Sequence, residues 1–289
     1  MWLEPPKLTF KKQLIIHCDD LGMAHSINQA AFKALEEGAI SSGSAMANCP
    51  WFAEVADYAR EHSNLDLGLH LVLTSEWPQY RWRPMAPHRS VPSLIDTRGY
   101  LWPDSATVVQ RAKAAEVAIE LEAQMQHALQ CGFKPTHVDS HMFALLRRPD
   151  LFSTYVEFAR RHRLPFLASG KANMAPDILA LLQDEDIILN GCFTAKATWS
   201  PERWFAHYAA DVANLNPGPN QIIVHLAVDE AEMRSIAGGR TAWGPAWRQR
   251  DLDVITSQEF RALLAQNDVE IIGWLDLKGL SPPGPFKDI

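Results

Sequence analysis

Short apolar runs alternate along the chain with longer segments of helical periodicity. The runs, which are typical of buried strands, lie at residues 13–17, 39–48, 65–73, 136–141, 164–169, 186–190, 221–227 and 269–276. Apolar residues recur at three- and four-residue steps in segments 26–37, 51–62, 107–131, 150–162, 175–183, 201–213 and 257–266. This alternation predicts an α/β fold with parallel strands covered by helices. We expect a (β/α) barrel of seven to eight mostly parallel strands, with an open doubly wound sheet as the alternative.

The pattern predicts one domain over residues 1–289 with two irregular parts. Residues 74–106 form an inserted loop region that is long for a barrel loop and carries three tryptophans, including Trp77. Their rings either stack on a sugar or close a lid over a site, or they pack together as a small core under the loop. Residues 281–289 are rich in proline, which indicates an extended tail.

Polar side chains gather where the apolar runs end. They are Asp19 and Asp20 in "HCDDLG", His70 in "LGLHL", His137, Asp139 and His141 in "THVDSH", and His225 in "IIVHLA". The carboxyl ends of parallel barrel strands converge on one face, where the active sites of such barrels lie. One carboxylate and two imidazoles suit a divalent ion such as Zn²⁺ and leave positions for water and substrate. The aspartate that does not bind the ion would then be free to act as a base, although "DDLG" alone is also typical of an ordinary strand-to-helix turn.

Composition narrows the class of ligand. The chain has 47% apolar residues and a net charge of −7 without a basic stripe, which argues against nucleic acid and anionic membranes as partners. Four cysteines without a C-x-x-C pair indicate a reducing compartment, and the N-terminus lacks the apolar core of a signal peptide. We therefore expect a cytoplasmic protein. The sequence contains no G-x-G-x-x-G, P-loop or G-x-S-x-G motif.

The successive motifs "HCDDLG", "SGSAMANCP", "LGLHLVLT" and "KPTHVDSH" resemble those of the YdjC-like carbohydrate deacetylases, the family that includes chitooligosaccharide deacetylases. The resemblance covers about residues 13–160 and continues more weakly into "VHLA". It implies an incomplete (β/α) barrel, one bound divalent ion, Zn or Mg, and hydrolysis of an N-acetyl group on a saccharide.

By motif position, the resemblance makes Asp20, His70 and His141 the metal ligands and Asp19 the general base. His225 is the candidate general acid. His137 is expected to orient a ligand or the substrate, and Asp139 to hold an imidazole tautomer, unless the two simply anchor their strand.

Two departures from the family pattern concern the substrate and the proton donor. Met142 and Phe143 follow "HVDSH", where family members often carry further histidines, and "HLA" replaces the usual His-Pro-Gly. Alternatives to a deacetylase are therefore a metal-dependent hydrolase of another amide or a phosphoester, and an inactive sugar-binding barrel.

The segment 238–254 is expected to be a loop rich in Gly, Trp and Arg. Trp243 or Trp247 would stack on a sugar ring, and Arg248 or Arg250 would donate hydrogen bonds to the substrate. The alternative is an interface loop in a homo-oligomer.

Overall fold

The computed structural model describes residues 11–168 and 175–278. The predicted tail at 281–289 lies outside the described residues. Within them, every helix is too short or too polar to cross a lipid bilayer.

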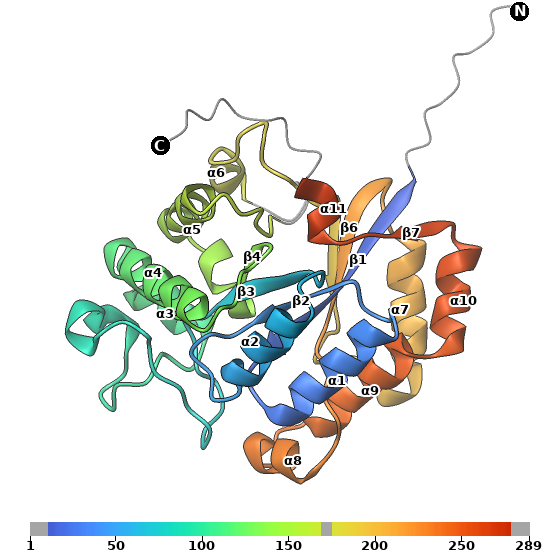
Figure 1. Ribbon diagram of the computed structural model, residues 1–289, viewed down its shortest axis with the longest axis horizontal. Helices are drawn as coiled ribbons and strands as arrows, with labels where there is room; N and C mark the ends of the chain where they lie inside the picture. Colours follow the sequence, from blue (N-terminus) through green and yellow to red (C-terminus); the bar gives the residue numbers. More distant parts are fainter. Residues whose placement is uncertain (1–10, 169–174, 279–289) are drawn as a thin grey trace, which may run out of the picture.

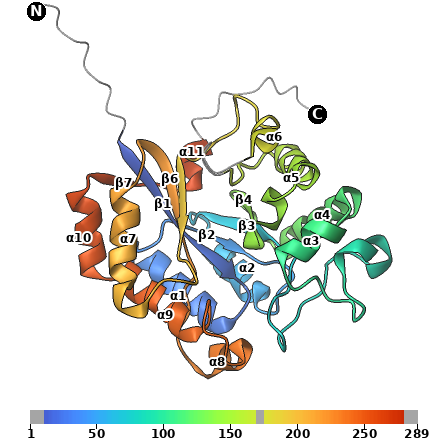
Figure 2. The same cartoon turned by 180° about the vertical axis from the view of Figure 1, so that it is seen from behind.

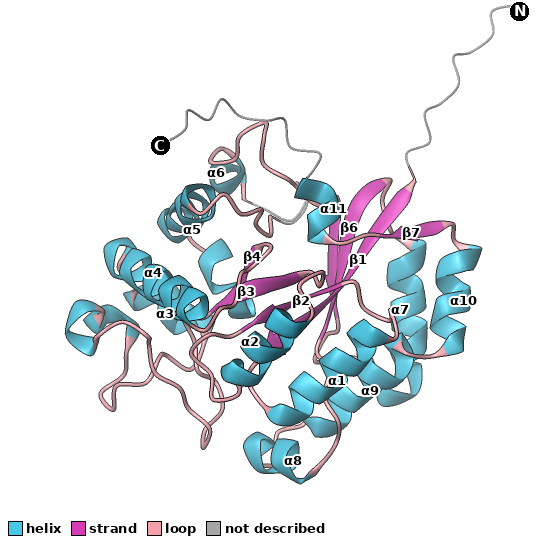
Figure 3. Ribbon diagram, in the orientation of Figure 1, coloured by secondary structure: helices cyan, strands magenta, loops and turns pink. Residues whose placement is uncertain are grey.

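Seven parallel strands form one curled sheet (Figures 1 and 3). The strands are β1 (Lys12–Leu21), β2 (Ser42–Ala45), β3 (Leu67–Leu71), β4 (Val138–Ser140), β5 (Gly191–Thr194), β6 (Gly218–Val224) and β7 (Val269–Ile271). Their order is β4-β3-β2-β1-β6-β5, and β7 pairs with β1. Strand β1 lies in the middle of this order and is buried from Leu14 to Leu21, which explains its continuous apolar run "LII". Among the described strands, β4 and β5 end the order, so the barrel is incomplete, as predicted.

Most helices lie on the outer side of the curled sheet, and Figure 2 shows the same arrangement from behind. The described helices are α1 (His25–Glu36), α2 (Phe52–Glu61), α3 (Ser105–Arg111), α4 (Ala114–Gln130), α5 (Pro149–Arg161), α6 (Pro176–Leu179), α7 (Trp204–Ala213), α8 (Ala231–Ala237), α9 (Pro245–Ile255), α10 (Gln258–Gln266) and α11 (Trp274–Lys278). Helix α11 instead packs Trp274 with Ile15 and Ile223, on the opposite face of the sheet. Between helices and sheet lies one large apolar core, and a smaller cluster surrounds Trp274.

Several predicted boundaries are wrong. The run at 164–169 makes only a single bridge, between Phe166 and Val138, in its described part. The run at 186–190 lies just before β5, which begins at Gly191. The run is apolar because Ile187 and Leu189 pack in the cluster around Trp274. The expected strand 269–276 ends at Ile271, and α11 begins at Trp274.

The predicted helix 107–131 is two helices, α3 and α4. The chain is extended at Ala112, with φ −64° and ψ 136°. Arg148 donates to the carbonyl oxygens of Val109 and Ala112, so the end of α3 is satisfied by a side chain rather than by a further helical turn.

One face of α4 anchors the inserted region. Glu120 accepts the backbone N–H groups of Met85 and Ala86, both at 2.9 Å, and Glu116 accepts that of Ser93 at 2.6 Å. Burial raises the pKa of Glu120 to about 7 against the effect of these donors. Backbone N–H groups of the insertion thus bind side chains of α4, and the sequence of the insertion gives no sign of these contacts.

Candidate metal centre and active site

Strand β1 places two adjacent carboxylates in the same cavity, although neighbouring strand residues normally point to opposite faces. The register between β1 and β2 shifts between Cys18 and Leu21, and Asp20 adopts a left-handed conformation with φ 70°. Aspartate tolerates this conformation better than most residues. The bulge therefore turns Asp20 to the side on which Asp19 already lies, and both line one cavity.

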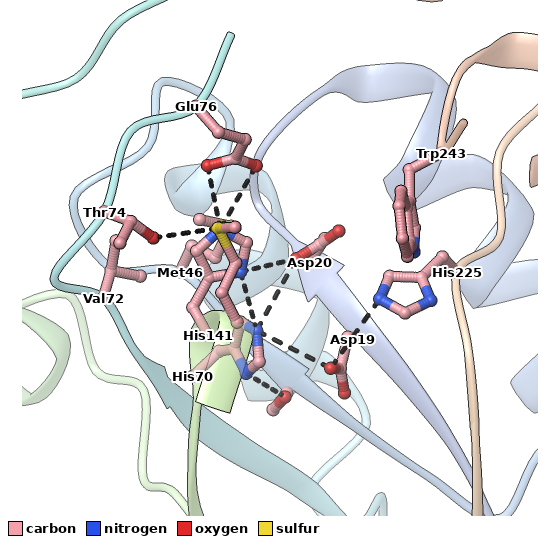
Figure 4. Close-up of polar contacts among 12 residues, drawn as sticks. Asp19, Asp20, Met46, His70, Val72, Thr74, Glu76, His141, His225 and Trp243 are labelled. Carbon is pink, nitrogen blue, oxygen red and sulfur yellow. Dashed lines mark hydrogen bonds and ion pairs between the residues drawn. The ribbon is translucent and has the colours of Figure 1, made fainter. Parts of the chain in front are cut away.

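Asp20, His70 and His141 bring three ligand atoms together (Figure 4). Asp20 Oδ1 lies 3.5 Å from His70 Nε2 and 3.2 Å from His141 Nδ1, and the two ring nitrogens are 3.2 Å apart. For these three edges, the equidistant point is about 1.9 Å from each atom, close to the 2.0–2.2 Å of zinc–ligand bonds. Asp20 Oδ1 is buried without a hydrogen-bond partner. The residues thus fit a divalent ion.

Each of these three residues is held by a further side chain. Asp139 Oδ1 lies 2.7 Å from His70 Nδ1, and Glu76 lies 3.1 Å from His141 Nε2. These contacts fix the ring tautomers that leave His70 Nε2 and His141 Nδ1 facing Asp20. Arg248 Nη2 donates to Asp20 Oδ2 at 2.6 Å, which leaves the other oxygen toward the histidines.

These contacts set the proton affinities of the centre. Burial alone would raise the pKa of Asp20, but Arg248 and the two histidines hold it well below its usual range. Burial likewise opposes a charge on His141, yet Glu76 and Asp20 raise its pKa to about 9. The free site therefore holds protons on its histidines, which a metal ion must displace.

Asp19 and His225 lie beside this cluster. Asp19 Oδ2 is 3.8 Å from His70 Nε2 and 3.9 Å from His225 Nε2 (Figure 4). Burial, reinforced by the charge of Asp139, raises the pKa of Asp19 to about 8 despite the nearby His70. Burial lowers the pKa of His225 to about 3, so its imidazole is neutral at rest.

The cavity beside the cluster has a volume of about 220 Å³. It is lined by Asp19, Asp20, Glu76, Trp77, Ser140, His141, Met142, Phe143, Arg147, Thr194, Ile223, His225, Arg240, Trp243 and Arg248. The indole N–H of Trp77 and the Nη1 group of Arg248 are buried without a hydrogen-bond partner. Both are therefore donors to which a bound molecule could offer an oxygen.

Most of the sequence-predicted site residues meet here, but His137 does not line the cavity. Its ring is fully buried, stacks on Trp274 with centroids 5.2 Å apart, and its Nδ1 lies 2.9 Å from Thr136 Oγ1. Trp77 and Trp82 are both buried in the large core, so these tryptophans pack the insertion onto the barrel, and Trp77 also lines the cavity.

The expected loop at 238–254 is wrong in its second half, where α9 begins at Pro245. The Gly244-Pro245 pair starts this helix, since proline is favoured in the first turn. The helix carries Arg248 back to the end of β1.

Sequence reasoning missed Glu76 and His17. Glu76 lies in "TSEW", shortly after β3. The tryptophans of this segment suggested a lid or a small core, and nothing in the sequence marks Glu76 as a partner of a metal ligand. His17 precedes Asp19 by two residues, and the strand period of two places both side chains on one face. The alternation of side chains along the strand could therefore have predicted that His17 lies near Asp19.

Comparison with known proteins identifies the family. The profile of the family described as YdjC-like protein matches residues 13–266. This chain therefore belongs to the YdjC-like family.

Individual relatives give the match more detail. A protein of Thermus thermophilus named carbohydrate deacetylase is 34% identical over 91% of this chain and 94% of its own length. A chitooligosaccharide deacetylase of Yersinia enterocolitica is 31% identical over 54% of this chain and 58% of its own. A crystal structure from Enterococcus faecalis V583, provisionally described as a cellobiose-phosphate cleavage protein, superposes with a TM-score of 0.78 at 26% identity, covering 92% of this chain and 99% of that one.

Proposed function

We propose that this protein is a metal-dependent hydrolase that removes an N-acetyl group from an amino-sugar-containing saccharide. The observation that carries the proposal is the cluster of Asp20, His70 and His141 with a further carboxylate, Asp19, in the same cavity. The names of the Thermus and Yersinia relatives supply the class of substrate.

Two imidazole nitrogens and one carboxylate oxygen form a donor set that suits Zn²⁺ better than Mg²⁺, which prefers oxygen ligands. A bound divalent ion would polarise the amide carbonyl and lower the pKa of water at the site. Asp139 and Glu76 would keep the two histidines in the tautomers that bind it.

Asp19 is the proposed general base. A base must be ionised to accept a proton, and Asp19 in the free site is favoured in its neutral form by burial. A neighbouring dication favours the ionised form of a carboxyl group, so the cation and the base become active together. Asp19 Oδ2 then takes the proton from the attacking water.

His225 is the proposed route for that proton to the leaving amine. Because its imidazole is neutral at rest, it must receive a proton before it can donate one. Asp19 Oδ2, 3.9 Å from Nε2, would supply it through a bridging water or after an approach of about 1 Å in the substrate complex. One proton would thus pass from water through Asp19 and His225 to the amine nitrogen, which leaves as the amide C–N bond breaks.

Three further side chains are proposed to hold the saccharide. Arg248 Nη1 is buried without a partner while its Nε donates to Trp243 O at 2.8 Å, so Nη1 is an unused donor for a substrate oxygen once the groups that cover it make way. Trp243 lies beside His225, with ring centroids 6.5 Å apart, where a sugar ring could stack (Figure 4). Trp77 offers its indole N–H.

The test is acetate release from a panel of N-acetylated mono- and oligosaccharides by protein stripped of metal and reconstituted with zinc or magnesium. We expect release only after reconstitution, and more with zinc. Absence of acetate from every substrate while metal is demonstrably bound would overturn the proposal. Hydrolysis of a phosphoester panel by the same samples would identify the other reaction class.

A further inference from the structure

His17 is a fully buried histidine that lies under the metal cluster and outside the cavity. Its Nδ1 is 3.1 Å from Ser42 Oγ, and its Nε2 is 2.9 Å from Asp139 Oδ2. Nε2 also lies 3.1 Å from Ser44 Oγ and 3.3 Å from Asp19 Oδ1. One ring edge therefore reaches both the proposed base and the carboxylate that orients His70.

Asp139 decides which end of the His17 ring donates. A carboxylate can only accept, and Asp139 Oδ2 lies 2.8 Å from the Ser44 hydroxyl, which donates to it, and 2.9 Å from His17 Nε2. Ser42 Oγ lies 3.1 Å both from His17 Nδ1 and from the carbonyl oxygen of Asp66, which also accepts from the Gly43 N–H, so this hydroxyl can serve Nδ1 as donor or as acceptor. Nε2 is therefore the ring nitrogen that donates, and Asp139 is its acceptor.

The charged and titratable groups that face His17 are consistent with this assignment. The carboxyl groups of Asp19 and Asp139 face it, and His137 packs edge-on with ring centroids 5.1 Å apart. Asp19 Oδ1 approaches Nε2 closely without a hydrogen bond and is otherwise unpartnered. Such an approach is attractive because the Nε2–H edge of an imidazole carries partial positive charge.

We propose that His17 donates from Nε2 and is the positioning residue of the site: it draws Asp19 Oδ1 inward and holds Asp139 against His70. This inference rests on the proposed function, because it assigns Asp19 the role of base. With Oδ1 drawn toward His17, Oδ2 remains toward His225 and the cavity. One imidazole thereby aligns the base with the ligand His70.

Two substitutions separate the two ends of the ring. H17Q places an amide nitrogen near the position of Nε2 and keeps the donor to Asp139. H17N reaches only the position of Nδ1 and keeps the contact with Ser42. Both substitutions remove the imidazole and leave a polar amide. Any effect of losing the buried ring is therefore shared, and a difference between the two variants reports the position of the donor.

Turnover is measured at saturating zinc, with zinc content and folded fraction determined for each sample. We expect H17N to lower kcat by about 10- to 100-fold, the range found for partners of metal ligands, with KM little changed. H17Q should retain clearly more of kcat than H17N. Equal kcat per folded molecule in the unmodified protein and both variants would overturn the inference, since a merely structural histidine would affect only the folded fraction.

A second measurement does not depend on turnover. In the ¹⁵N spectrum of the zinc-loaded protein, the ring signals that disappear in H17Q belong to His17. A protonated-type Nε2 supports the inference, and an unprotonated Nε2 overturns it. If the unmodified protein releases no acetate, the proposed function fails, and this spectrum still decides whether His17 donates from Nε2.

Discussion

Arg248→Met tests the electrostatic design of the centre most sharply. The guanidinium and the Asp20 carboxylate are 2.6 Å apart, and their side chains are 1% and 2% exposed. Removing one partner of a buried pair costs about 3–5 kcal/mol, and the protonated His70 and His141 beside Asp20 keep the cost near the lower end of that range. We expect the metal-free R248M protein to lose that amount of unfolding free energy.

Zinc should reverse much of this loss, because a bound cation supplies Asp20 with positive charge. The zinc-induced stabilisation is therefore expected to be larger in R248M than in the unmodified protein. Adding Asp20→Asn to R248M should restore stability in the metal-free state, since the unpaired charge disappears.

The assay is urea unfolding followed by circular dichroism, with chelator and with excess zinc. Arg250→Met is the matched control: it is the same substitution on the same helix, and it removes a half-buried guanidinium that lies 5.8 Å from the Trp204 ring centroid. The control should lose about 0.5–1 kcal/mol. If R248M resembles R250M with chelator, or gains no more from zinc than the unmodified protein, the account of the Arg248–Asp20 pair is wrong.

Three further predictions concern the surroundings of the centre. Glu76→Gln should weaken zinc affinity by about 10- to 100-fold in calorimetric titration, because a neutral amide oxygen is a weaker acceptor for His141 Nε2–H than the carboxylate, while Glu54→Gln on the outer face should not. Because the pKa of His141 is raised to about 9, zinc must displace its proton at lower pH, so the apparent Kd should rise by about tenfold per pH unit for each displaced proton below pH 9; a Kd that is constant down to pH 6.5 would contradict this. Burial raises the pKa of Glu120 from 4.5 to about 7, so the neutral carboxyl group stabilises the folded protein fully below pH 4.5, and this stabilisation is lost as the pH rises to about 7. The free energy of unfolding should fall by up to about 3 kcal/mol across this window. The fall should be smaller in Glu120→Gln, which has no proton to lose.

The strand ends could be predicted because parallel strands and buried apolar runs leave a strong pattern. Asp20, His70 and His141 each follow or end such a run, and the topology of a parallel sheet brings those ends together without any knowledge of side-chain contacts. The resemblance to a known family then assigned the two aspartates different roles, which spacing alone could not do.

The rest depends on interactions between distant parts of the chain. Arg248 pairs with Asp20 across 228 residues, and its segment was expected to be a loop because tryptophan, glycine and arginine obscured the short helix α9. The left-handed conformation of Asp20 is imposed by the bulge against β2 and has no signature in "DDLG" beyond the tolerance of aspartate. His137 carries the same local pattern as a ligand, yet its strand position directs it to Trp274.

The division of labour between Asp19 and Asp20 is the central claim, and Asp19→Asn compared with Asp20→Asn tests it directly. Zinc content and acetate release are measured on the same samples. The account predicts that D19N keeps its zinc and loses turnover by at least about 100-fold, the lower range for general-base catalysis, whereas D20N loses both. A D19N protein that turns over normally, or a D20N protein that binds zinc like the unmodified chain, would contradict it.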